Sequence, residues 1–500
     1  MTVPGLKLDP RSSVAVYRQI ADGIRTAIRD GRVLPGQQLP PTRELAEQLG
    51  VNRNTVVAAY DLLIDDGTVS GHTGRGTFVA ASAASPGPAD GAWFGSFSRA
   101  LQSAAAANLQ AHYRAAMSSE GISFAGSYPA ADLLPVDEFR RAMTTALRER
   151  GAEILSYGPT AGYAPLRAEI AAGMRARGSR VSADDLVITN GSQQAIEIVL
   201  RAFVDPGDAV VVEDPTYTGA LGVLGALGAR LVGVPTDADG VRVDLLARAL
   251  ERHRPRVMYL QPTFHNPTAR VLSEPRRREV VELAARHACV VVEDDWAGDL
   301  RFEGDDLPTL HALDGGRHVV YLSTFSKKLI PGIRVGWVAA RAAVRDRLLT
   351  IKQVEDHGTS LVLQAALHAF LENGSLEPHL AKVRSAYLAR RDAMLAALDR
   401  RFPATARWSR PQGGLFVWVE LPPGIDSGEL AVDAQRHGVS IGPGALFQVD
   451  GRGSGAMRLS FASTAPERIE QGIAVLGRWV CDRSVAHAAA REDHDAVPVL

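Results

Sequence analysis

The stretch STFSKKLIPGIR at residues 323–334 decides how most of this chain is interpreted. It follows the apolar run HVVYL at 318–322, which is typical of a buried parallel strand. A lysine in a hydroxyl-rich turn after such a strand suits Schiff-base chemistry, because burial and neighbouring charge keep the amine neutral enough to attack an aldehyde. Arg334, seven residues beyond Lys327, can bind a phosphate with two parallel hydrogen bonds. Together they indicate pyridoxal 5'-phosphate (PLP); by itself, the stretch is equally compatible with a surface turn carrying two solvated lysines.

Length and composition restrict the class of protein. A chain of 500 residues implies more than one domain, and 46% hydrophobic with 22% charged residues is ordinary for a globular protein. The net charge of −1 provides no overall attraction to nucleic acid or membrane. Two cysteines, Cys289 and Cys481, argue against a disulfide framework and fit a reducing cytoplasm. No apolar run predicts export or a membrane span, and no residue set is assigned to a metal.

Residues 12–80 are predicted to form a compact, mainly helical head. The first helix carries apolar residues on one face, and glycine and proline at 31 and 35–36 end it. A short helix at 43–49, with Thr42 as its N-cap, is followed by a turn at Gly50 and a third helix capped by Asn52. The residues expected to face inward are Val16, Ile20, Ile24, Ala27 and Ile28 in the first helix and Val56, Val57, Tyr60, Leu63 and Ile64 in the third.

This order is the helix-turn-helix arrangement, in which the second helix of the pair enters the DNA major groove with its N-terminal residues against the bases. Arginine there can bind guanine and asparagine can bind adenine. The segments 68–70 and 77–79 flank a glycine-rich turn and predict a β-hairpin wing. A small protein-binding domain is the alternative, since residues 1–80 carry a net charge of only +1. The candidate DNA-binding residues are Arg43, Asn52, Arg53, Asn54, Thr55 and Arg75.

Two segments are predicted to lack a folded core. Residues 81–118 are rich in alanine, serine, proline and glycine, as in a flexible linker. Residues 483–500 are polar and are expected to form a disordered tail.

The body, residues 119–482, alternates short apolar runs with helical stretches, which predicts an α/β domain with a large, mostly parallel sheet. Ligands of such sheets bind beyond the carboxyl ends of the strands. The expected strands are 186–189, 209–213, 230–234, 256–260, 289–293, 319–322 and 335–339.

Candidate ligand-binding residues follow these strands. Gly191, Ser192 and Gln193 open a helix after the first strand and make an anion site, although Ser192 is also an ordinary helix cap. Tyr217, after the second strand, can stack on a pyridine ring or lie in the core. Asn266, in QPTFHNPT at 261–268, can hydrogen-bond the ring oxygen, although Asn-Pro is also a turn signal.

A carboxylate beside the pyridine nitrogen would keep that nitrogen protonated. Asp294 at a strand end is our choice for this role, and Asp295 is the rival. Thr324, three residues before Lys327, can add a phosphate hydrogen bond. Arg458, on the alternating strand MRLSF, can bind a ligand carboxylate or form a surface salt bridge.

The head and the body each resemble a known family. LPPTRELAEQLGVNRNTVVAAY at 39–60 followed by GRGTFV at 74–79 is similar to a GntR-type winged helix-turn-helix. The body motifs, in their order, resemble fold-type I aminotransferases, with a large mostly parallel domain and a smaller α+β domain. That resemblance implies that Lys327, rather than Lys328, forms the Schiff base with PLP. It also implies that Tyr157 reaches across a dimer to the neighbour's phosphate, and that Trp296 stands where the family commonly has a tyrosine donating to the ring oxygen.

A GntR-type head fused to such a body resembles the MocR/GabR group of bacterial transcription regulators. The resemblance implies a homodimer that binds double-stranded operator DNA with paired half-sites. It also implies that the body senses PLP or an amino compound, controlling vitamin B6 or amine and amino-acid genes. Residual transamination remains compatible with a sensor. The alternatives are an active aminotransferase carrying a DNA-binding head and a scaffold that binds no cofactor.

Overall fold

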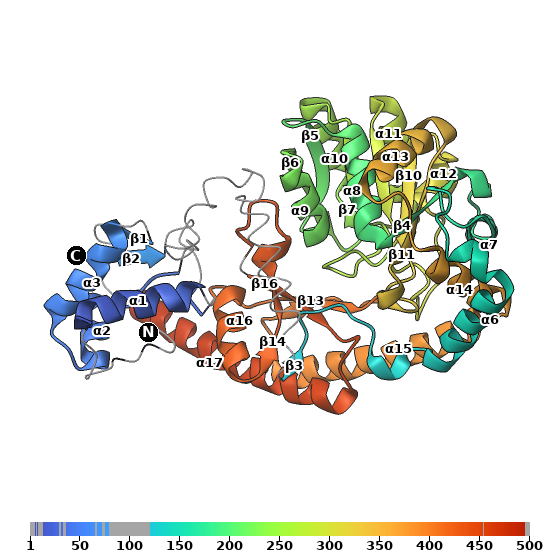
Figure 1. Cartoon of the computed structure of the whole chain (residues 1–500). Coiled ribbons are helices and arrows are strands. Elements are labelled where there is room, and N and C mark those ends of the chain that lie inside the picture. The colour runs from blue at the N-terminus through green and yellow to red at the C-terminus, as the bar shows by residue number, and fades with distance from the viewer. Residues whose placement is uncertain are drawn as a thin grey trace. The chain divides into compact units, whose positions relative to one another are not determined.

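The computed structural model describes Leu6, Leu8 and residues 14–29, 32–33, 37–65, 68–72, 76–79, 121–453 and 455–495. The chain divides into two compact units, Met1–Arg99 and Ala100–Leu500. The linker expected at 81–118 lies outside the described residues, as does the candidate DNA-binding residue Arg75. Figure 1 shows the head in blue and the body from cyan to red.

The head is a three-helix unit with a two-stranded hairpin, as the sequence predicts. Gly50 ends the second helix in the left-handed conformation at φ 66°, which glycine adopts without strain. Tyr60 is buried, and its hydroxyl donates to the carbonyl of Pro40, which ties the third helix to the entry of the second. The elements are α1 (Val16–Arg29), α2 (Thr42–Leu49), α3 (Arg53–Asp65), β1 (Val69–His72) and β2 (Gly76–Val79).

Three details of the head differ from the prediction. Thr42 is the first residue of α2 rather than its N-cap, because Pro41 occupies that position without a side-chain cap. Val16 and Ile64 are each 41% exposed, since they lie in the first turn of α1 and the last turn of α3, where the helices extend beyond the core. Val57 is only half-buried. The remaining predicted core residues of α1 and α3 are buried.

The body is built on one eight-stranded sheet with the order β4-β11-β10-β9-β8-β5-β6-β7. Strands β5, β6, β8, β9 and β10 are parallel, whereas β11 is antiparallel to both β10 and β4, so β4 points the same way as β10. All seven predicted strands are present; the short edge strand β7 was not predicted. The strands are β4 (Leu186–Asn190), β5 (Ala209–Asp214), β6 (Arg230–Asp237), β7 (Gly240–Val241), β8 (Val257–Leu260), β9 (Val290–Asp294), β10 (Val319–Thr324) and β11 (Val335–Ala339).

Helices cover both faces of this sheet (Figure 1). Successive residues of the central strands point to opposite faces: Val210 and Val212 pack with residues of α8, α9 and α13, and Val211 packs with residues of α10, α11 and α12. The helices are α7 (Ala164–Ala176), α8 (Gly191–Phe203), α9 (Thr218–Ala226), α10 (Val243–His253), α11 (Glu274–His287), α12 (Leu310–Asp314), α13 (Ala342–Glu355) and α14 (Leu361–Glu372).

A smaller α+β part completes the body, as expected. Its four-stranded sheet has the order β12-β13-β16-β15, and β3 (Ile122–Ser123) pairs with β14 (Val439–Ser440) in a second small sheet. The long helix α6 (Val136–Ile154) packs instead with α7, α14, β4 and β11 of the larger part. The other elements of the smaller part are α15 (Leu376–Arg401), β12 (Arg407–Trp408), β13 (Phe416–Glu420), α16 (Ser427–Arg436), β15 (Gly442–Pro443), β16 (Ala456–Ser460) and α17 (Pro466–Asp495).

The helix α17 continues past residue 482, where the sequence analysis expects a disordered tail to begin. The segment after 482 is rich in alanine, the best helix former, and this composition explains the continuation. In the described part of the chain, no helix combines the length and apolar character that crossing a bilayer requires.

Candidate functional site

The site gathers at the carboxyl ends of the parallel strands. Asn190, Asp294 and Thr324 end β4, β9 and β10, and the turn that carries Lys327 joins β10 directly to β11. Because these strands are neighbours in the sheet, residues far apart in sequence meet at one edge.

Lys327 is a partly buried amine surrounded by positive charge. Its Nζ donates to the carbonyl of Ser127 at 2.9 Å and lies 5.7 Å from the ring centre of Tyr128. Burial, followed by the nearby guanidinium groups of Arg334 and Arg458, lowers the pKa of Lys327 to about 8. About a tenth of this amine is therefore neutral and nucleophilic at pH 7, far more than for an ordinary lysine.

The neighbouring lysine has a structural environment. Lys328 forms an ion pair with Asp299, and its Nζ lies 4.7 Å and 5.0 Å from the ring centres of Phe325 and Trp337. Because these interactions occupy the ammonium of Lys328, this lysine is less suited than Lys327 to form a Schiff base.

An anion cradle forms where α8 begins. Gly191 has a φ of 74°, and a Cβ there would lie 2.3 Å from Nη2 of Arg334, so a side chain would displace the guanidinium. Arg334 donates to the carbonyl of Asn190 at 3.3 Å and to Oγ of Ser326 at 3.3 Å. The helix has no side-chain cap, which leaves the N–H groups of its first turn, with Ser192, available to an anion.

Thr324 and Gln193 have internal partners. The Thr324 hydroxyl donates to the carbonyl of Val335 at 3.1 Å and accepts from the backbone N–H of Ser326 at 3.1 Å. Gln193 donates to the carbonyl of Gly219 and accepts from the hydroxyl of Tyr217 at 3.2 Å. Ser326, which the sequence analysis did not select, therefore lies between Thr324 and Arg334.

Asp294 is completely enclosed and has one unused oxygen. Its Oδ2 accepts from the hydroxyl of Tyr259 at 2.5 Å and from the amide of Gln261 at 2.9 Å, whereas Oδ1 is buried and has no partner among the residues that the structure describes. Burial raises the pKa of Asp294 to about 6, despite both donors. A carboxylate with a free, buried oxygen fits a protonated ring nitrogen.

The rival carboxylate, Asp295, is occupied in a different network. Its Oδ2 accepts from Tyr321 at 2.8 Å and forms an ion pair with Arg177 at 3.2 Å, and its Oδ1, like that of Asp294, is buried without a partner among the described residues. Because Asp295 already has a cationic partner and Asp294 has none among the described residues, the geometry favours Asp294 as the partner of a ring nitrogen.

Arg458 is a buried arginine without a counterion. It is 1% exposed, donates to Oδ1 of Asn266 at 2.8 Å and to the carbonyl of Ala125 at 2.5 Å, and leaves Nε without a partner. Within the described residues, no carboxylate pairs with it, and burial lowers its pKa to about 9. Its guanidinium lies 4.3 Å and 4.7 Å from the ring centres of Phe416 and Phe447. A surface salt bridge is thereby excluded, and the environment suits a ligand carboxylate.

Asn266 and Trp296 border the same region. Asn266 is buried beside Arg458, which orients its side chain. Trp296 is 6% exposed, its ring centre lies 5.4 Å from that of Phe416, and its buried Nε1 has no partner within the described part of the chain. An indole N–H can donate to a ligand but cannot ionise as a tyrosine can.

Tyr157 lies apart from these residues within one chain. Its side chain is 96% exposed, in the loop between α6 and α7. The side chains of Val136, Leu155 and Val354 are also exposed. The structure of one chain thus does not bring Tyr157 to the other candidate residues.

The DNA-reading candidates of the head lie in the first turns of α2 and α3. The side chain of Asn52 accepts from the backbone N–H of Asn54 at 2.9 Å, which confirms it as the cap of α3. Arg53 is exposed and its Nε approaches the hydroxyl of Thr42 at 3.4 Å. Arg43 is exposed with Glu47 at 3.6 Å, and Thr55 is half-buried.

Comparison with known proteins matches both units. Residues 125–476 match the family Aminotransferase class I and II, and residues 16–79 match the bacterial regulatory proteins of the gntR family. The uncharacterised HTH-type transcriptional regulator YisV of Bacillus subtilis is 31% identical, covering 95% of this chain and 97% of its own. The probable rhizopine catabolism regulatory protein MocR of Rhizobium meliloti is 29% identical, with 94% of each chain covered.

A solved structure resembles the body. LysN, an alpha-aminoadipate aminotransferase from Thermus thermophilus crystallised with N-(5'-phosphopyridoxyl)-L-leucine, is 37% identical with a TM-score of 0.72. The alignment covers 78% of this chain and 98% of LysN.

Proposed function

Because this chain belongs to the Aminotransferase class I and II family and carries a gntR-type head, we propose that it is a PLP-dependent transcription regulator of the MocR type. The observation that carries the proposal is that relatives named as regulators share both units over more than nine-tenths of the chain. A DNA-binding regulator of a bacterium works in the cytoplasm, where the operator is.

The cofactor part of the proposal rests on the start of α8, which has no side-chain cap, and on the buried Oδ1 of Asp294, which has no partner among the described residues. The phosphate would lie against the first turn of α8 and Arg334, and the free Oδ1 of Asp294 would accept the ring N–H. Lys327 supplies the amine that holds the aldehyde end. When bound, PLP supplies an aldehyde carbon to amines and a protonated ring that withdraws electrons.

The effector part of the proposal rests on Arg458. A buried guanidinium without a counterion is unfavourable, and a carboxylate held by two parallel hydrogen bonds would remove that cost. We therefore infer that the body senses an amino compound with a carboxylate, or PLP alone, rather than a simple amine.

Regulation follows from linkage. A ligand that binds one arrangement of the body more tightly than another shifts the equilibrium toward that arrangement. If operator half-sites prefer the same arrangement, ligand and DNA affect each other's affinity by the same factor. We propose that PLP and the amino effector act on the heads in this way, with vitamin B6 or amine and amino-acid genes as the targets.

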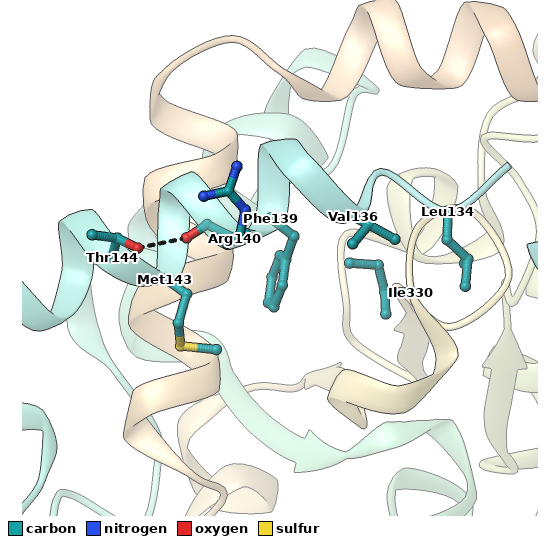
Figure 2. Close-up of a pocket in the computed structure, with 7 residues that line it drawn as sticks. All are labelled: Leu134, Val136, Phe139, Arg140, Met143, Thr144 and Ile330. Atoms are coloured by element: carbon teal, nitrogen blue, oxygen red, sulfur yellow. Dashed lines mark hydrogen bonds between the residues drawn. The ribbon is translucent and has the colours of Figure 1, made fainter. Parts of the chain in front are cut away.

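The regulator is proposed to be a homodimer, and an apolar groove supports this. The groove has a volume of about 340 Å³ and lies between α6 and the segment that follows Lys327. Figure 2 shows Val136 and Phe139 of α6 together with Ile330 at this groove. A partner chain that binds this face would cover the apolar surface. In such a dimer, Tyr157 of one chain would reach the cofactor site of the other chain.

A working aminotransferase is the second candidate, favoured by the likeness to LysN. Conversion of PLP to pyridoxamine 5'-phosphate by a panel of amino acids, followed by return with a 2-oxo acid, separates the two. Slow or single turnover fits a sensor, whereas multiple turnover at ordinary enzyme rates of about 1–1000 per second would support the enzyme.

The decisive experiment is a footprint on the DNA that flanks this protein's own gene, with and without PLP. We expect protection of two half-sites whose pattern or affinity changes with PLP. Borohydride reduction followed by peptide mapping should locate the cofactor on Lys327, among five lysines in the chain. If no DNA were protected, the proposed role as a DNA-binding regulator would be wrong. If the adduct formed on another lysine, the proposed cofactor site would be wrong.

A further inference from the structure

Lys352 is a fully buried lysine that the proposed cofactor site does not include. It lies near the end of α13, is 0% exposed, and its Nζ, with three N–H donors, lies within hydrogen-bonding distance of four oxygen atoms. Two are the carboxylate oxygens of Asp356 at 2.8 Å and 3.0 Å, and the others are Oε1 of Gln194 at 3.0 Å and Oγ1 of Thr359 at 3.1 Å. A buried lysine persists only where charge and hydrogen bonds compensate its desolvation, so this network is tightly constrained.

The network leads directly to the start of α8. Oδ2 of Asp356 accepts from the side-chain amide of Asn190 at 2.5 Å and from Nε2 of Gln194 at 2.7 Å. Oε1 of Gln194 also accepts from the backbone N–H of Asn190 at 2.8 Å. Asn190 precedes Gly191, and its carbonyl accepts from Arg334. The residue at the start of the anion cradle is therefore held by its backbone N–H, its side chain and its carbonyl.

The consequence is that Asn190 cannot cap α8. Its side chain is drawn to Asp356 rather than to the first N–H groups of the helix, and those groups stay available. The conformation also places Gly191 at a positive φ against Arg334.

We propose that Lys352 is a positioning residue for phosphate: through Asp356 and Gln194 it fixes Asn190 so that the N-terminus of α8 and Arg334 converge on one anion. This inference rests on the proposed cofactor function, and it concerns only the phosphate end of the ligand. Lys352 touches neither the phosphate nor the aldehyde end in this account.

Two variants of the full chain and two ligands test the inference. Lys352→Met removes the charge and keeps the length of the side chain, and Asp356→Asn removes the charge that holds Asn190. Dissociation constants are measured for PLP and for pyridoxal, which has the same ring and aldehyde without phosphate. Both variants should weaken PLP about tenfold, the typical effect of a lost charge-assisted hydrogen bond, and leave pyridoxal within about twofold.

The two variants also separate positioning from direct electrostatics. If Lys352 acted only through its charge, Lys352→Met would weaken PLP and Asp356→Asn would tighten it, since one removes a positive and the other a negative charge near the phosphate. Opposite effects would therefore overturn the inference, as would unchanged PLP affinity in both variants.

A control variant distinguishes positioning from a general loss of structure. Arg391 on α15 is also buried and ion-paired, with Glu303 at 2.8 Å, but belongs to the smaller part of the body. Arg391→Met should lower the melting temperature without changing the ratio of PLP to pyridoxal affinity. If Lys352→Met weakened both ligands equally, the role would be structural and the inference would fall. Wild-type protein without preference for PLP over pyridoxal would refute the cradle itself, whereas failure of DNA binding would refute only the regulator.

Discussion

Replacement of Lys327 by methionine should stabilise the ligand-free protein at neutral pH and destroy covalent capture of PLP. The pKa of Lys327 lies at about 8 instead of 10.5, first because of burial and then because of Arg334 and Arg458. Each pKa unit corresponds to about 1.4 kcal/mol, so keeping this amine charged in the folded protein at pH 7 costs about 3 kcal/mol. Loss of the hydrogen bond to the carbonyl of Ser127 offsets about 1 kcal/mol, leaving a net gain of about 2 kcal/mol.

The stability difference between Lys327→Met and the parent protein should depend on pH. The folded pKa is lowered, so the cost is fully present below pH 8 and fades as pH rises from 8 toward 10.5, where the unfolded chain also loses the proton. Lys327→Met should therefore be more stable than the parent at pH 7 and have no advantage at pH 10.

Urea unfolding of PLP-free protein at the two pH values measures this difference. The adjacent lysine is a matched control, because Lys328 is ion-paired with Asp299. Lys328→Met leaves that carboxylate buried with less compensation and should destabilise the protein by about 1–3 kcal/mol. A Lys327→Met variant that is less stable than the parent at pH 7, or equally stabilised at both pH values, would refute the account of the buried amine.

Three further substitutions test separate parts of the proposal. Asp294→Asn removes the carboxylate with the free Oδ1, so PLP should bind about tenfold more weakly in a titration while borohydride still labels Lys327. 3-Methylbutylamine has the structure of L-leucine without the carboxylate, and Arg458→Met should reduce the ratio of the affinities for L-leucine and this amine by about tenfold. An unchanged ratio would exclude Arg458 as the carboxylate site. Arg53→Ala should weaken operator binding by about 1–3 kcal/mol with PLP still bound, and unchanged affinity and salt dependence in a gel-shift titration would show that α3 is not oriented as proposed.

Much of the fold could be predicted from local pattern. The central strands are continuous apolar runs because both faces are covered, and such runs stand out from amphipathic helices. The direction of β11 could not be predicted in this way, since an apolar run carries no information about its pairing. The strand β7 was not predicted because two residues are too few to form a periodic pattern.

The candidate site was predictable where chemistry and position coincide. Lys327, Asp294 and Arg334 follow or end strands, and the rule for open sheets selects them. Sequence reasoning left Asp294 and Asp295 as rivals, and only the ion pair of Asp295 with Arg177 distinguishes them, since each has one buried oxygen without a partner among the described residues. The role of Lys352 could not be predicted because it is a single lysine within a helix and its partner Gln194 is distant in the sequence.

The antiparallel course of β11 has a consequence for how this body can diverge. Lys327 and Arg334 both lie in the connection between two adjacent central strands, which are registered residue by residue from Tyr321–Ala339 to Thr324–Gly336. A single inserted or deleted residue in this hairpin-like connection would displace the amine and the guanidinium together. Descendants that keep the cofactor are therefore expected to keep the length of this connection, whereas those that abandon it are free to lengthen or shorten it.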